Sequence, residues 1–135
     1  MKKIVLVLIA FLATTSLMWS QDITLTDEEV QKLLCKSWQM GYTIANGEIA
    51  EQKNGTPNIA FNFRKDHTFD FIENGSKTAV GEWRLIPEKK WVALAIQRKV
   101  SLLITSINEK EFVAISTNQI SSPGKEKREV VFKVK

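Results

Sequence analysis

The sequence predicts an all-β protein, an eight-stranded antiparallel up-and-down barrel with a short N-terminal helix plugging one end. Three observations lead to this prediction. From Trp38 onward, apolar and polar residues alternate with a period of two in eight short segments. Turn-forming residues separate these segments at even intervals. No connection is long enough for a crossover helix, so neighbouring strands should be antiparallel.

The predicted strands are each about seven residues long, which corresponds to ~23 Å of extended chain. They cover residues 38–44, 58–64, 68–74, 79–85, 91–97, 100–106, 111–117 and 128–134. Asn46–Gly47 and Asn74–Gly75 are typical turn signals. Eight such strands most simply close into a barrel, because closure removes exposed strand edges. An open sandwich is the alternative architecture.

A short amphipathic helix should precede the first strand. Thr26 and Glu29 have the spacing of a capping box, in which each side chain binds the other residue's backbone N–H. The predicted helix runs from Asp27 to about Cys35. Its apolar face is formed by Val30, Leu33 and Leu34. We expect this face to close the barrel end beneath Trp38.

Residues 1–20 are predicted to be a signal peptide, and residues 21–135 the barrel domain. Lys2 and Lys3 precede an apolar run over 4–13, which is too short for a membrane-spanning helix of about 20 residues. Cleavage after Ser20 fits best, with cleavage after Ser16 and a retained anchor as alternatives. The expected location is therefore the periplasm or the extracellular space, with no membrane span after cleavage.

The charge balance argues against a nucleic-acid partner. The formal net charge is +4, and removal of Lys2 and Lys3 with the signal lowers it to +2. Acidic and basic residues are interspersed, which is typical of a solvated surface. The single cysteine cannot form an internal disulfide. We expect a monomer.

Enzymatic motifs are lacking in the sequence. His67 is the only histidine, lies in a turn and has no metal-ligand spacing to Cys35. There is no glycine-rich phosphate loop and no nucleophile motif. The carboxylates fall on outward or rim positions: Asp66, Asp70, Glu73, Glu82 and Glu111. The sequence therefore predicts a protein that is not an enzyme and has no cofactor or metal.

Alternation also predicts which side chains point into the barrel. The inward set comprises Trp38, Met40, Tyr42, Ile44, Ile59, Phe61, Phe63, Phe69, Phe71, Trp83, Leu85, Val92, Leu94, Ile96, Val100, Leu102, Ile104, Val113, Ile115, Val130, Phe132 and Val134. An eight-stranded barrel is wide enough to be filled by such side chains or to hold one small ligand. Both outcomes remain open at this stage.

Arg128 shares the parity of the inward residues of the last strand and should lean inward at the mouth opposite the helix. A guanidinium there suits a ligand carboxylate, which it can bind with two parallel hydrogen bonds. The alternatives are an ion pair with Glu73 or exposure to water.

The segments "CKSWQM", "FNFRKDHTFDF" and "GEWRL", in this order after a short helix, resemble the lipocalin-like domains of small exported bacterial proteins, a calycin-type barrel. The resemblance covers residues 26–135. It implies a β-barrel and the binding of a small hydrophobic ligand, and it brings no catalytic motif.

Two functions fit these features. The first is binding of a small hydrophobic or fatty-acid-like ligand, with Tyr42, Phe61, Phe71 and Arg128 lining the route. The alternative is a protein-interaction module of the cell envelope, an inhibitor or assembly accessory, with a filled core and polar loops such as 46–58. Cys35 follows two leucines at a helix end, so we expect it to pack as a small hydrophobe and not to carry a lipid.

Overall fold

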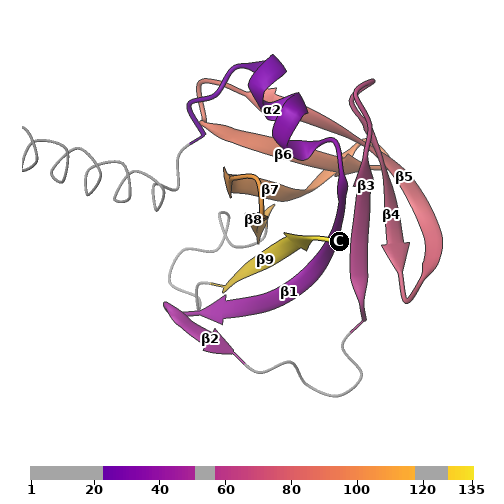
Figure 1. Cartoon of the computed structure of the whole chain (residues 1–135), viewed down its shortest axis with the longest axis vertical. Coiled ribbons are helices and arrows are strands. Elements are labelled where there is room, and N and C mark those ends of the chain that lie inside the picture. Colours follow the sequence, from indigo (N-terminus) through magenta and orange to yellow (C-terminus); the bar gives the residue numbers. More distant parts are fainter. Residues whose placement is uncertain (1–22, 51–56, 118–127) are drawn as a thin grey trace, which may run out of the picture.

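The computed structural model describes residues 23–50, 57–117 and 128–135, and these form a β-barrel with one short helix (Figure 1). The predicted signal peptide lies outside these residues. The helix is α2 (Asp27–Leu34). The strands are β1 (Ser37–Ala45), β2 (Glu48–Ala50), β3 (Ile59–Phe63), β4 (Thr68–Glu73), β5 (Ser76–Ile86), β6 (Trp91–Ile96), β7 (Lys99–Ile107), β8 (Glu111–Ser116) and β9 (Arg128–Val134).

The predicted eight-stranded up-and-down barrel is confirmed. Strands β3 to β9 pair in sequence order, and β1 pairs with both β3 and β9, which closes the sheet. Every pairing is antiparallel. The alternative of an open sandwich is therefore wrong.

Strand β2 is an additional element that the sequence analysis missed. It pairs only with the end of β1, through Thr43–Ala45. Asn46 and Gly47 connect the two strands with φ values of +53° and +83°, the left-handed conformation of a type I′ hairpin turn. The turn signal was correct, and the residues after it form a short strand before the chain continues to β3.

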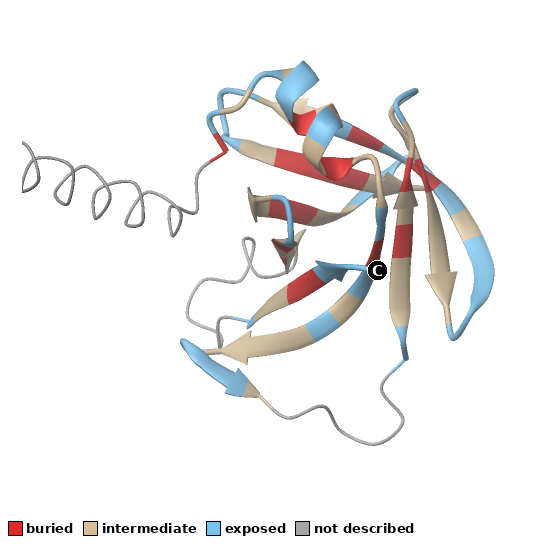
Figure 2. Ribbon diagram, in the orientation of Figure 1, coloured by how far each residue is buried: buried red, intermediate tan, exposed pale blue. Residues whose placement is uncertain are grey.

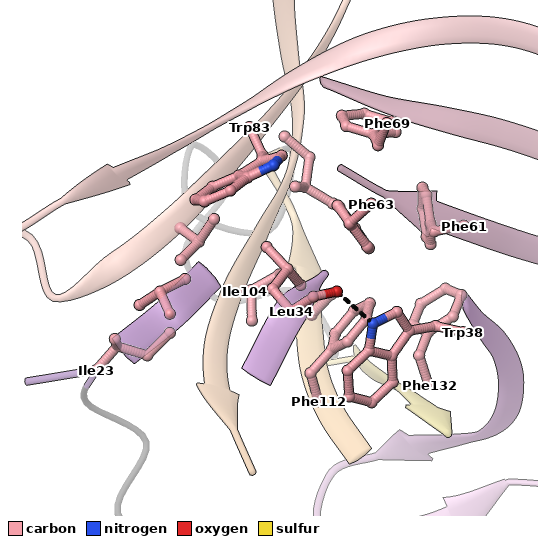
Figure 3. Close-up of a cluster of buried hydrophobic side chains, with 14 residues drawn as sticks. Ile23, Leu34, Trp38, Phe61, Phe63, Phe69, Trp83, Ile104, Phe112 and Phe132 are labelled. Carbon is pink, nitrogen blue, oxygen red and sulfur yellow. Dashed lines mark hydrogen bonds between the residues drawn. The ribbon is translucent and has the colours of Figure 1, made fainter. Parts of the chain in front are cut away.

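Helix α2 plugs one end of the barrel, as predicted. The capping box of Thr26 and Glu29 is formed, and Val30 and Leu34 are fully buried. The indole N–H of Trp38 donates to the Leu34 carbonyl oxygen over 2.9 Å, which ties the helix to the first strand (Figure 3). We call this the helix end of the barrel and the opposite end the far end.

An aromatic cluster fills the helix end and the middle of the barrel (Figure 3), and the strands there carry the buried positions that are red in Figure 2. Its buried rings belong to Trp38, Phe61, Phe63, Phe69, Trp83, Phe112 and Phe132. Gly81 is required here, because a Cβ atom would overlap the Phe69 ring and lie 2.5 Å from the Ala95 carbonyl oxygen. The ring therefore packs directly on the β5 backbone.

Three strands depart from the predicted inward parity. A bulge in β1 between Met40 and Tyr42 turns Tyr42 and Ile44 outward. A second irregularity, between β6 and β7, turns Val100 outward, opposite Ala95. In β8 the predicted parity is reversed, so the predictions that Val113 and Ile115 point inward are wrong.

The reversed parity of β8 places Phe112 and Ala114 in the core. The Phe112 ring lies 4.9 Å from the rings of both Trp38 and Phe132, centroid to centroid. Burying a phenyl ring in this cluster removes more apolar surface from water than burying Val113 would. The aromatic residue therefore decides which face of the strand points inward.

Candidate functional site

The candidate site is the inner wall of the far end. Here the core cluster is bordered by apolar side chains that remain partly exposed, in contrast to the buried aromatic rings behind them. We call this set the far-end wall: Met40, Ile59, Phe71, Ile96, Leu102 and Val130. Its members come from six strands and face the barrel axis. The wall thus presents partly exposed apolar side chains next to the buried floor residue Phe61.

Phe61 and Phe71 are both on the inner side, as predicted. They are directly paired across β3 and β4, and their ring centroids lie 5.6 Å apart. Phe61 is buried, whereas Phe71 is partly exposed. Phe61 therefore belongs to the packed floor and Phe71 to the wall that solvent reaches.

Arg128 is the first residue of β9 and is exposed at the far end. It is paired with Ala45 and has the same parity as Val130 and Phe132, which pack in the core. The register therefore places Arg128 on the inward-facing side of β9, as the sequence predicted. Glu73 is at the same end, where it accepts a hydrogen bond from the Thr78 hydroxyl over 3.4 Å.

Tyr42 is not part of the inner wall, and the prediction that it points inward is wrong. It is paired with Val131 on the outer side, and the Lys133 ammonium lies 5.3 Å from its ring centroid. Partial burial, with Glu111 contributing, raises the pKa of its phenol. The bulge at Gly41 causes the change. Glycine suits this position, because a Cβ atom would lie 3.1 Å from both the Lys133 side chain and the Val131 carbonyl oxygen. A glycine within a strand often marks a bulge, so Gly41 was the sequence feature that could have predicted it.

The bulge brings different residues to the inner side of β1. Thr43 is opposite Val130, and Ala45 is opposite Arg128. In β8, Ser116 is paired with the wall residue Leu102. The hydroxyl-bearing residues Thr43 and Ser116 therefore occupy inward-facing positions at the far end. The sequence prediction missed both residues because it assumed unbroken alternation.

Cys35 caps the C-terminus of α2 and packs against the core, as predicted. Its backbone N–H donates to the Gln31 carbonyl oxygen. Burial raises the pKa of its thiol, so the thiolate required of a nucleophile is disfavoured. Its contacts are those of a small apolar side chain at the helix end.

His67 connects the helix to the barrel. Its ring packs against the Trp83 ring with centroids 4.2 Å apart and a tilt of 31°, and its Nε2 lies 3.2 Å from both carboxylate oxygens of Asp27. The Trp83 indole N–H in turn donates to the Arg64 carbonyl oxygen over 3.0 Å. A structural role accounts for this turn histidine.

Among the described residues, no three His, Cys, Asp or Glu side chains are grouped in a way that would hold a metal ion. Within the same residues, no helix has the length and apolar character needed to cross a membrane. Comparison of the chain with protein-family models, curated proteins and solved structures finds no match. Fold and side-chain geometry alone therefore guide the assignment of function.

Proposed function

We propose that this chain is an exported, non-enzymatic, lipocalin-like protein that binds a small hydrophobic or fatty-acid-like ligand at the far end of its barrel. One observation carries the proposal: inward-facing apolar side chains are partly exposed there, and Arg128 stands on the inward register beside them. Exposed apolar surface on the concave side of a barrel suits an acyl chain, since its transfer from water is favourable.

The polarity of the site suggests how such a ligand would be oriented. Its chain would lie along the far-end wall with its end toward Phe61, and its carboxylate would remain at the rim. There the Arg128 guanidinium offers two parallel N–H groups, the geometry that binds a carboxylate most strongly. The location proposed for the protein is the periplasm or the extracellular space, following from the signal peptide predicted over residues 1–20.

Titration with a dansyl-labelled undecanoic acid and its methyl ester tests this proposal. Arg128→Gln should weaken binding of the acid about three- to tenfold and leave the ester unchanged, because only the acid carries a charge. Lys133→Gln is the matched control, since Lys133 lies on the outward side of the same strand. Leu102→Gln should weaken binding of both probes by placing a polar group on the wall.

Native mass spectrometry of the protein from its own host provides the second readout, with a co-purifying lipid expected. The proposal is overturned if neither dansyl probe binds and no lipid co-purifies. It is also overturned if Lys133→Gln weakens binding as much as Arg128→Gln does.

A further inference from the structure

An apolar hollow lies on the outer face of the barrel, away from the far-end wall. It has a volume of about 400 Å³ over strands β5, β6 and β7. Its lining comprises Ile86, Lys89, Trp91, Ala93, Val100 and Leu103, with Thr117 at one side. Ala93 lies between the core residues Val92 and Leu94 and must point outward, and its partner Leu103 does the same in β7.

The sequence of these strands accounts for the hollow. Ala93 is small and is paired with Leu103, so it leaves space between Trp91 and the longer side chains of β7. The irregularity between β6 and β7 turns Val100 to the same side, where it is 40% exposed. Leu103, by contrast, is only 4% exposed although it lies on an outer face. The hollow therefore has a buried apolar base and an apolar rim.

Lys89 adds a positive charge at the edge of this apolar lining. It lies in the turn between β5 and β6, whose backbone is held by bonds from the N–H groups of Lys89 and Lys90 to the Ile86 carbonyl. Ile23 N–H also donates to the Lys90 carbonyl over 3.0 Å. The charged side chains of this turn are those of Glu88, Lys89 and Lys90. Among the described residues, Lys89 forms no ion pair.

We propose that this hollow is a second binding site, for a small aromatic or aliphatic molecule that carries an anionic group. The volume falls in the range of small-molecule sites, roughly 300–1,000 Å³. Trp91 provides an aromatic side chain in the lining, and Lys89 provides charge complementarity from a turn held by backbone hydrogen bonds. This site is independent of the far-end wall, which uses the opposite face of the sheet.

The aromatic anion anilinonaphthalene sulfonate is a suitable probe, with its fluorescence rise as the readout. Lys89→Gln should weaken binding about threefold at low salt, the effect of an exposed charge pair. Near 1 M salt, where charges are screened over about 3 Å, the difference should disappear. Val100→Gln should weaken binding at both salt concentrations, and its side chain is exposed enough to leave folding intact.

Two controls locate the probe. Lys110→Gln changes an exposed lysine in another turn of the helix end and should bind the probe as the wild type does. Leu102→Gln changes the far-end wall, so the probe should still bind at the hollow, and Lys89→Gln and Val100→Gln should still weaken that binding when combined with it. Sedimentation with and without the probe should give a monomer mass. The proposal is overturned if the probe does not bind, if Lys89→Gln and Val100→Gln leave its binding unchanged, or if Leu102→Gln alone removes it. A dimer that forms through this face and excludes the probe would also overturn it.

Discussion

At the scale of single residues, the ion-pair cluster around Asp70 shows how charge is placed on the outer face of the barrel. Asp70 Oδ1 lies 2.8 Å from Arg64 Nη1 and 3.2 Å from Lys77 Nζ. This oxygen is shielded from water, so both cations act on it at close range. The Arg64 guanidinium beside Asp70 holds the pKa of the carboxyl below its ordinary value.

Asp70→Asn should therefore lower the free energy of unfolding at neutral pH by about 1 kcal/mol, a modest value because both cations are substantially exposed. A carboxyl with a lowered folded-state pKa stabilises the fold above its unfolded pKa of about 3.9, and this contribution is lost as the pH falls through the folded value. The difference between wild type and variant in urea unfolding should thus shrink below about pH 4. A difference that stays constant down to the lowest pH would contradict this assignment.

At the scale of elements, the helix is held by its buried face more than by its length. Eight residues are too few for an isolated helix to be stable in water. Val30 is fully buried in the core cluster, whereas Lys32 is exposed. The packing of α2 against the barrel should therefore depend on the Val30 side chain and hardly on the Lys32 side chain.

Val30→Ala should lower the free energy of unfolding by about 2 kcal/mol, because it leaves a cavity beneath the helix. The matched variant Lys32→Ala should change it by less than about 0.5 kcal/mol. Denaturant unfolding followed by tryptophan fluorescence measures both, since Trp38 is bonded to the end of the helix. Equal effects of the two substitutions would show that the helix does not close the barrel.

Two hairpin turns show which local conformations could be predicted from the sequence. The Asn74–Gly75 turn has both residues at positive φ, as its sequence predicts, because these residue types tolerate that conformation. Gln97 and Arg98 make an equivalent turn between β6 and β7 with φ values of +54° and +66°. Neither residue type favours this conformation, so pairing of the two strands must impose it. Local preference alone could not have predicted the register there.

The candidate site was predictable only where alternation was unbroken. Phe61, Phe71 and Arg128 lie on strands whose parity continues from the core, and their inward positions were correctly predicted. Tyr42 lies beyond a bulge, and one extra residue moves every later side chain to the other face. The outer hollow could not be predicted from parity either, since it depends on how Val100 is turned between two strands.

At the scale of the whole molecule, closure of the barrel depends on the last strand. Strand β9 pairs with β8 on one side and with β1 on the other, and it contributes Phe132 to the aromatic cluster. Without it, β1 and β8 would each expose an unpaired edge to solvent. The C-terminal strand should therefore be required for the fold as a whole.

A chain truncated after residue 127 should lose its cooperative unfolding transition and associate through its open edges, as measured by circular dichroism and size-exclusion chromatography. Adding a synthetic peptide of residues 128–135 in trans should restore monomeric, β-rich protein, because the peptide supplies both missing pairings and the Phe132 ring. A scrambled peptide of the same composition is the control and should not restore it, since alternation decides which side chains reach the core. A truncated chain that remains monomeric and unfolds cooperatively would show that the sheet is stable when open.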